Sequence, residues 1–275
     1  MALLDLLMQY FEVLIALALG LCFGSFATAI IYREPRNLSW ITNEVSQKAT
    51  RSQCPSCGHT LKWYDLVPLF SWSLAKGRCR YCNSSIGWKY PLVEFVSLLL
   101  FGLNYSQFGL SIEFAIVSVA TCFLLALFVI DWDHYILPNR LVVIVLSCGV
   151  IFHAQSIYTY GWSLDYINNI VAAVLLPLTV FLLGLITSKL KGRDTLGFGD
   201  VKLFAAVGLW LGLSYIPAIM ICSGIGGVFL ALIWRCLKRG EVFPFGPAII
   251  VSLYAGILVQ YGDDFEVVRS YIQLI

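Results

Sequence analysis

Long apolar stretches alternate with short polar ones through most of the chain, and this pattern predicts helices that cross a membrane. A bilayer core takes about 20 apolar residues in one helix. We expect eight spans, at about residues 11–32, 91–109, 112–130, 141–157, 166–188, 201–216, 217–235 and 245–261. The sixth and seventh are the hardest to separate, because only a short turn around Pro217 lies between them.

One polar block, at about residues 33–90, interrupts the apolar pattern. It is too long for a simple connection between two helices, so we expect a small domain of its own. The predicted organisation is an N-terminal transmembrane helix over residues 1–32, an insert domain over 33–90 and a seven-helix transmembrane domain over 91–275. The expected fold class is therefore an all-α integral membrane protein.

Composition and charge agree with this fold class and predict an orientation. The chain is 59% hydrophobic and 12% charged, whereas soluble domains average about 25% charged residues. With the N-terminus outside and eight alternating helices, seventeen of the eighteen Lys and Arg residues fall on the cytosolic side, and only Arg269 stays outside. The positive-inside rule favours this topology, with both termini outside and the insert domain in the cytosol. The expected surroundings are a lipid bilayer, and we expect no nucleic-acid partner.

Two CxxC pairs in the insert domain predict a metal site. They are Cys54 with Cys57, and Cys79 with Cys82, and 21 residues lie between the pairs. Two such pairs at this spacing are typical of a tetrahedral, four-thiolate structural zinc site. A cytosolic location is reducing and argues against structural disulfides. A redox-active dithiol pair and disulfides remain the alternatives.

Two aspartates at the ends of apolar segments are the candidate catalytic residues. Asp131 ends one apolar run, and Asp200 precedes another after the segment Gly197–Gly199. Counting helices places both at the cytosolic border of the bilayer, where an ionisable group indicates function. Two neighbouring carboxyl groups hold one proton between them. The charged one can then accept a proton from water while the neutral one donates to a carbonyl.

Structural interpretations of the same residues stay open at this point. Asp200 has the position of a helix N-cap, Asp131 has that of a residue facing cytosolic water, and Asp133 competes with Asp131 for its role. Glu94 follows Pro91 early in the second span, where an acid is favoured by the helix dipole. It is also a weak candidate for a cofactor-binding residue, and no other residue of such a site can be named.

Several motifs in order along the chain resemble the type IV prepilin peptidases, which also process type II secretion pseudopilins. They begin with Gly24-Ser25-Phe26 and Tyr32-Arg33, continue through the two CxxC pairs, and include Trp63-Tyr64-Asp65, Gly77-Arg78-Cys79-Arg80 and Tyr90-Pro91-Leu92-Val93-Glu94. The resemblance ends with Asp131 to Asn139, Gly197 to Leu203 and Pro244-Phe245-Gly246-Pro247. One departure is Ala27-Thr28, where the family usually has Leu-Asn.

The resemblance implies a bifunctional enzyme of the bacterial inner membrane. It implies that Asp131 and Asp200 hydrolyse the bond after the basic leader of prepilins and pseudopilins. The new amino terminus would then be methylated with S-adenosylmethionine, and the four cysteines would bind zinc. Two rival functions remain, a proton-coupled transporter and a non-enzymatic assembly factor of a pilus or secretion system. The sequence does not identify the pilins processed, the oligomeric state, the residues of the methyl-donor site or a role for zinc in methylation.

Overall fold

A computed structural model describes residues 2–38, 40, 51–192, 196–236 and 243–262. Every regular element in these residues is a helix, and the only strand-like pairings there are the isolated bridges Gln53–Thr60 and Arg78–Ser85. The chain divides into two compact units, Met1–Phe114 and Ala115–Ile275. The all-α fold class is thus confirmed, and the predicted three-part division of the chain stays a prediction.

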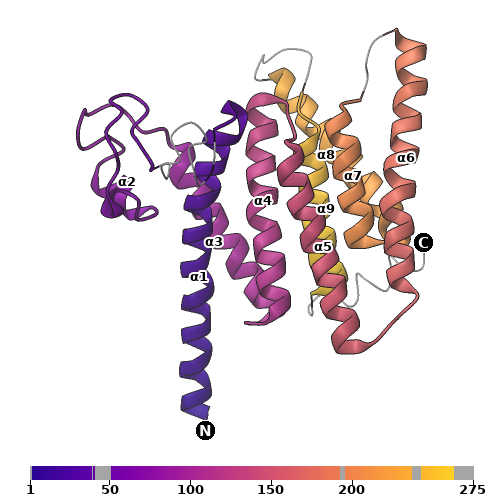
Figure 1. The fold of residues 1–275 in the computed structure, drawn as a ribbon, viewed down its shortest axis with the longest axis horizontal. Coiled ribbons are helices and arrows are strands. Elements are labelled where there is room, and N and C mark those ends of the chain that lie inside the picture. Colours follow the sequence, from indigo (N-terminus) through magenta and orange to yellow (C-terminus); the bar gives the residue numbers. More distant parts are fainter. Residues whose placement is uncertain (1, 39, 41–50, 193–195, 237–242, 263–275) are drawn as a thin grey trace. The chain divides into compact units, whose positions relative to one another are not determined.

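The first unit contains two long helices and the insert between them (Figure 1). Its elements are α1 (Ala2–Arg33), the 3₁₀ turns η1 (Glu34–Arg36) and η2 (Trp63–Asp65), the short α2 (Phe70–Leu74) and α3 (Lys89–Phe108). The second unit holds most of α4 (Ile112–His134), then α5 (Asn139–Tyr160), α6 (Asp165–Lys191), α7 (Phe198–Leu211), the turn η3 (Leu213–Tyr215), α8 (Ile216–Cys236) and α9 (Gly246–Tyr261).

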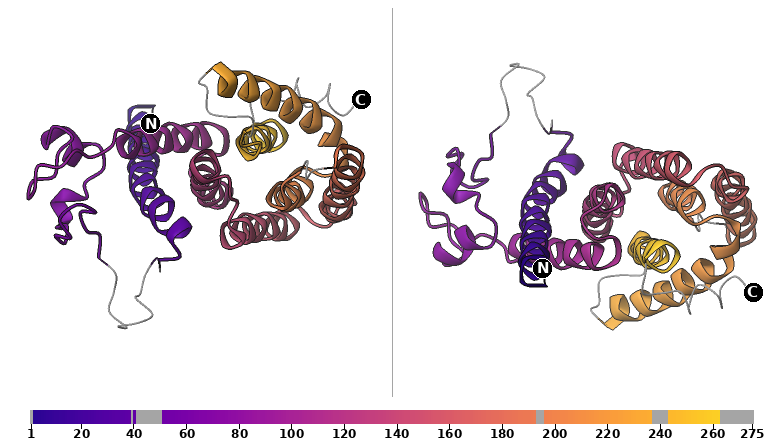
Figure 2. Two further views of the ribbon diagram at one scale, coloured as in Figure 1. Left: turned by 90° about the horizontal axis from the view of Figure 1, so that it is seen from above. Right: turned by 90° about the horizontal axis from the view of Figure 1, so that it is seen from below.

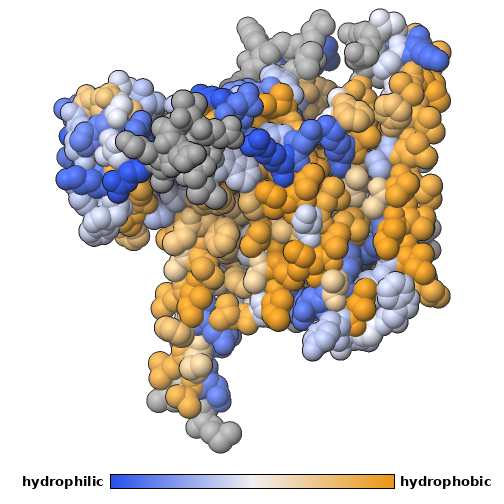
Figure 3. All heavy atoms as spheres, viewed as in Figure 1, coloured by the Kyte–Doolittle hydropathy of each residue, from blue (hydrophilic) through white to orange (hydrophobic). Residues whose placement is uncertain are grey.

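Eight helices of 14 residues or more within the described residues overlap the eight expected spans. Five stretches among these residues are long and apolar enough to cross a membrane: Leu4–Arg36, Ile112–His134, Asn139–Tyr160, Asp165–Lys191 and Leu213–Cys236. Apolar side chains cover the visible flank of the second unit (Figure 3), as lipid contact requires. The protein is therefore an integral membrane protein, and the number of crossings stays a prediction.

The break between the sixth and seventh helices falls earlier than the sequence suggested. Helix α7 ends at Leu211 rather than near residue 216, because Gly212 adopts a positive φ of 71° that favours glycine and terminates the helix. Pro217 then lies in the first turn of α8, where proline costs no hydrogen bond.

Glycines bring α1 and α3 into backbone contact in the first unit. A Cβ at Gly24 would lie 2.8 Å from Cα of Glu94, and one at Gly20 would lie 2.9 Å from Cα of Leu98. The Ser97 hydroxyl donates a 2.7 Å hydrogen bond to the Gly20 carbonyl. This small-xxx-small spacing is the usual means by which membrane helices pack closely, and it fixes the position of Glu94 against α1.

The short helix α7 lies in the interior of the second unit. It packs against α5, α6 and α9, and Figure 2 shows these helices end-on. Gly208 lies against the backbone of Ala172 on α6, with no space for a Cβ. Such contact fixes the depth of α7 and hence the position of Asp200 in its first turn.

Side chains from other helices form hydrogen bonds with the last carbonyl groups at the C-terminal end of α7. A helix of 14 residues is only about 21 Å long, so its last carbonyl groups end within the protein. His153 Nε2 is hydrogen-bonded to the Leu209 carbonyl at 2.8 Å, and the Tyr261 hydroxyl donates to the Trp210 carbonyl. Pairing of such groups is required where water is absent, so this histidine has a structural role at the end of α7 remote from Asp200.

Two glycine variants test this packing. We expect Gly208→Val to destabilise the protein by about 1–3 kcal/mol, because the added side chain overlaps the α6 backbone. Gly224→Val is the matched control, since a Cβ at this helical glycine of α8 meets nothing within 4 Å. Thermal unfolding in detergent should show a lower midpoint for the first variant alone. Equal midpoints would contradict the close contact.

Candidate functional site

Asp131 is a buried carboxylate near the end of α4. Its side chain is 5% exposed, three residues before the helix ends at His134. The Oδ2 atom is buried and has no well-formed hydrogen bond with any described residue. The interpretation that Asp131 simply faces cytosolic water therefore does not hold. A buried carboxylate oxygen without a partner is costly, and an observation of this kind indicates a site for a ligand or substrate.

The start of α9 lies directly against this carboxylate. A Cβ at Gly246 would lie 2.6 Å from Asp131 Oδ2 and 3.3 Å from Cδ1 of Leu137. Pro247 follows in the first turn, where its fixed φ suits the start of a helix. The sequence analysis noted this glycine and proline only as part of a resembling motif. Their place in the structure shows that glycine is needed for close approach.

Asp200 lies in the first turn of α7 and within electrostatic reach of Asp131. The N-cap of this helix is Gly197, and no side chain caps it, so the N-cap interpretation of Asp200 is wrong. The Asp200 amide instead donates to the Gly197 carbonyl at 3.1 Å. Leu137 also packs against Gly199, where an added Cβ would lie 3.1 Å from the Cβ of Leu137. The ends of α4, α7 and α9 thus converge around the two carboxylates.

An aromatic cluster supports the end of α4. The ring of Trp234, which is 2% exposed, meets Trp132 edge-on at 4.9 Å between centroids. Its Nε1 donates to the Tyr135 hydroxyl at 3.2 Å. Asp133 is two positions from Asp131, so on a helix it faces away from it, and it is only partly buried. These contacts favour Asp131 over Asp133 as the partner of Asp200.

The four predicted cysteine ligands form a second cluster, in the first unit. The Sγ atoms of Cys54, Cys57, Cys79 and Cys82 all lie within 4.8 Å of one another. Cys54 Sγ and Cys82 Sγ are 3.8 Å apart. Zn–S bonds of about 2.3 Å in a tetrahedron place sulfurs about 3.8 Å apart. The donor set and its geometry therefore fit zinc.

The two CxxC pairs form knuckles of the same geometry. The amide of Gly58 donates to the Cys54 carbonyl at 2.8 Å, and that of Asn83 donates to the Cys79 carbonyl at 2.9 Å. Both turns need a positive φ, 69° at Gly58 and 57° at Asn83. Asparagine tolerates this conformation better than most residues. The repeated turn explains how the distant pairs present four sulfurs to one point.

The first knuckle also favours the thiolate that a metal requires. The backbone amide of Cys57 hydrogen-bonds to the sulfur of Cys54 and lowers the pKa of that thiol to about 6, although burial opposes the shift. Zinc binds cysteine only as thiolate. His59 is exposed and stacks on Tyr81 with ring centroids 3.6 Å apart, so it contributes no ligand to the cluster.

Comparison with known proteins identifies the family. Residues 18–108 match the model of the bacterial peptidase A24 N-terminal domain, and residues 118–232 match the type IV leader peptidase family. The chain belongs to the type IV leader peptidase family. The resemblance seen in the sequence motifs is thereby confirmed, and the matched segments contain both aspartates and the cysteine quartet.

Three relatives align with this chain over most of its length. A prepilin leader peptidase/N-methyltransferase of Stutzerimonas stutzeri is 31% identical over 280 residues, covering 95% of this chain and 94% of the relative. A protein of the same description from Pectobacterium carotovorum is 33% identical, covering 88% and 91%. The type 4 prepilin-like proteins leader peptide-processing enzyme of Escherichia coli is 34% identical, covering 93% and 98%. No solved structure matches the chain.

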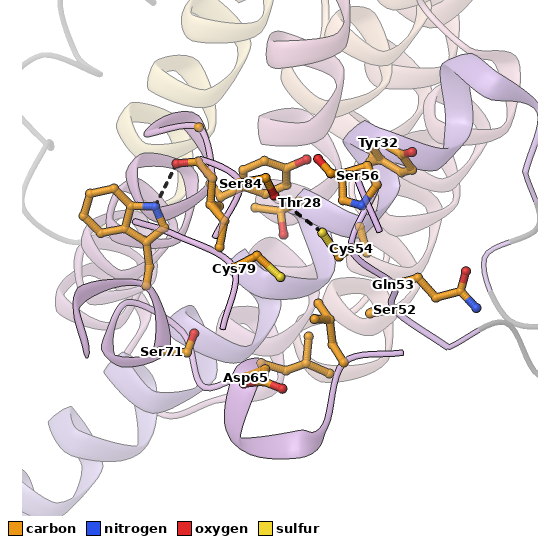
Figure 4. Close-up of a pocket in the computed structure, with 18 of the residues that line it drawn as sticks. Thr28, Tyr32, Ser52, Gln53, Cys54, Ser56, Asp65, Ser71, Cys79 and Ser84 are labelled. Atoms are coloured by element: carbon orange, nitrogen blue, oxygen red, sulfur yellow. Dashed lines mark hydrogen bonds between the residues drawn. The ribbon is translucent and has the colours of Figure 1, made fainter. Parts of the chain in front are cut away.

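The first unit contains a cavity beside Glu94, the residue that the sequence analysis gave as a weak candidate for cofactor binding. Its volume is about 1190 Å³, and Glu94 lies in its wall. Figure 4 shows Thr28 and Tyr32 of α1 and Cys54 of the first knuckle around the same space. The sequence signal that could have located it is the polar spacing of Ser25, Thr28 and Tyr32 on one face of an otherwise apolar helix.

Metal content tests the cysteine cluster. We expect purified wild-type protein to carry about one equivalent of zinc, and Cys54→Ser to lose it, because three thiolates hold the ion far less tightly than four. Cys222→Ser is the control, since this cysteine lies on α8 outside the cluster. Elemental analysis of protein in detergent provides the readout. A metal-free wild type, or equal zinc in Cys54→Ser, would contradict the site.

Proposed function

We propose that the protein is a bacterial inner-membrane enzyme that cleaves leader peptides from type IV prepilins and type II secretion pseudopilins. It then methylates the new amino terminus. The family and the names of the relatives support this function. The observation that carries the peptidase half is the buried Oδ2 of Asp131, which has no well-formed hydrogen bond within the described residues and lies within electrostatic reach of Asp200.

The proposed hydrolysis uses only the two carboxyl groups and water. The ionised member of the pair takes a proton from water, whose oxygen attacks the scissile carbonyl carbon. The protonated member donates a hydrogen bond to the carbonyl oxygen as negative charge develops there. The bond from carbon to nitrogen then breaks, and the leaving amine takes up a proton. No covalent intermediate with the enzyme is required.

The proposed orientation brings the bond to be cut to this pair. Both termini lie outside in this topology, and the cysteine cluster and both aspartates lie on the cytosolic side. Asp131 is near the end of α4 and Asp200 is in the first turn of α7, which matches a substrate bond at the membrane border. A proton-coupled transporter would instead use acids near the middle of the bilayer, so the positions favour the peptidase. Arg269, the only basic residue assigned to the outside, lies beyond the described residues.

The methyl step is a transfer to the amine that cleavage exposes. S-adenosylmethionine supplies an activated methyl group on sulfur, which the amine accepts while a neutral thioether and a proton are released. The relatives named as N-methyltransferases support this half. Zinc in the four-cysteine cluster would have a structural role, because the four sulfurs complete its coordination and leave no open position.

Replacing either aspartate with asparagine tests the peptidase proposal. We expect Asp131→Asn and Asp200→Asn each to slow prepilin cleavage by at least ~100-fold, because neither amide can exchange the proton with water. The assay follows leader removal from a purified prepilin by the enzyme reconstituted in lipid. Asp165→Asn, in the first turn of α6, is the matched control and should cleave normally.

The cleavage rates of the variants can be compared only if each variant is folded, and thermal unfolding in detergent checks the folding of each one. Cleavage at the wild-type rate by either folded aspartate variant would contradict the proposed pair. It would favour the alternative of a non-enzymatic assembly factor, for which amide replacements of the same shape would be tolerated.

A further inference from the structure

The cavity of the first unit is built from two helices and the cysteine knuckles. On α1, the lining residues Ser25, Thr28 and Tyr32 recur at the spacing of one helix face. Opposite them, α3 contributes Tyr90 and Glu94. The sulfur-bearing residues that line it are Cys54 and Cys79, the two buried members of the quartet. The cysteine knuckles and the two helices thus enclose one space.

Glu94 is the unusual residue of this wall. It is only 9% exposed, and its Oε2 accepts a 2.8 Å hydrogen bond from the amide of Leu69. Asp65, the other carboxylate of the cavity, pairs with Arg80 at 3.4 Å. Glu94 is hydrogen-bonded to the Leu69 amide and to the Ser25 side chain but has no ion pair with a described residue, and a buried carboxylate without an ion pair favours a cationic ligand.

The carboxylate of Glu94 is held in a fixed place. Its Cα lies against Gly24, where α1 and α3 are in backbone contact. The Leu69 amide donates to the Glu94 carboxylate, and Leu69 itself has a φ of +60°, a conformation that is strained for leucine. Strain of this kind persists only where surrounding contacts determine it, as at binding sites. The negative charge is therefore preorganised at the cavity wall.

We propose that this cavity is the site of the methyl donor S-adenosylmethionine, with the carboxylate of Glu94 facing the sulfonium group. The inference rests on the proposed methyltransferase function. Arg51 and Arg78 also line the cavity, and arginine is a suitable partner for the carboxylate of the donor. The cavity thus presents the opposite charges that a donor with a sulfonium and a carboxylate requires.

The size of the cavity fits a donor together with an acceptor. Pockets for single small molecules have volumes of about 300–1000 Å³, and this one has about 1190 Å³. The remaining space suits the end of a peptide chain. The ammonium of that chain is the other possible cation for Glu94. We assign the sulfonium because its charge is permanent, whereas an amine must lose its proton before it attacks a methyl group.

Paired ligands that differ in charge test the assignment. S-adenosylhomocysteine is the neutral thioether counterpart of the sulfonium donor. Binding of each to the full-length protein in detergent is measured by calorimetry for wild type, Glu94→Gln and Glu12→Gln. The glutamine at position 94 keeps an oxygen for the Leu69 amide and removes the charge, and its new amide nitrogen can donate to the Ser25 hydroxyl. Glu12 is the matched control, since it lies on α1 outside the cavity and accepts a hydrogen bond from Tyr105.

We expect Glu94→Gln to weaken binding of S-adenosylmethionine by about tenfold and to leave S-adenosylhomocysteine unaffected, because only the first carries the charge. Glu12→Gln should match wild type for both. An equal loss for both ligands would overturn the assignment and indicate a structural role for Glu94. Unchanged binding of both would also overturn it, and a raised KM for the peptide amine in that case would point to the ammonium.

A separate assay distinguishes failure of the site from failure of the function. Wild type is incubated with cleaved pilin and S-adenosylmethionine, and the amino terminus is analysed by mass spectrometry. If wild type methylates the pilin but Glu94→Gln retains the wild-type preference between S-adenosylmethionine and S-adenosylhomocysteine, the cavity assignment is overturned and the methyltransferase function stands. Absence of methylation by wild type would overturn the proposed methyltransferase function, and with it the basis for the assignment.

Discussion

The contact between the buried carboxylate of Asp131 and the backbone of Gly246 is the constraint on which the proposed peptidase site depends. It exists because glycine leaves space for Oδ2 at the start of α9, where any side chain would overlap it. The result is a carboxylate that is removed from water and whose Oδ2 has no well-formed hydrogen bond in the part of the chain that the structure describes. A protein tolerates such a cost where it serves chemistry, and in the proposed mechanism Asp131 and the neighbouring Asp200 share one proton.

Glycines also allow close contact between helices elsewhere in the protein, and these contacts position other acidic residues. Gly24 lets α1 approach α3 and fixes Glu94, and Gly208 lets the short helix α7 approach α6 and fixes the depth of Asp200. Each acidic residue of interest is therefore positioned by close contact of backbones rather than by a salt bridge. Membrane helices depend on such packing, because lipid gives them no hydrophobic reason to associate. The two proposed reactions accordingly use separate acids, each built into its own compact unit.

Much of this arrangement could be predicted from the sequence, because it follows from local pattern. Apolar length located all eight long helices, and cysteine spacing located the four-sulfur cluster. Counting helices placed Asp131 and Asp200 at the same side. The sequence analysis missed the N-cap at Gly197 and the end of α7 at Leu211, although the glycines that determine them are local. The walls of the cavity beside Glu94 and the close contact at Gly246 depend on segments that are distant in the sequence, so they could not be read locally. A helix pattern gives the face of a residue but not the backbone that lies opposite.

The most direct test of the account is whether the side chains at positions 131 and 200 meet in the membrane-embedded protein. Asp131→Cys combined with Asp200→Cys would be treated with a short bifunctional thiol reagent, and the joined peptides identified by mass spectrometry. Asp131→Cys with Asp165→Cys is the comparison pair, since Asp165 begins α6 at the far end of that helix from Lys191. The account predicts a cross-link between positions 131 and 200 and none between 131 and 165. Failure of the first pair to react, in folded protein whose two cysteines are each singly labelled by the reagent, would contradict it.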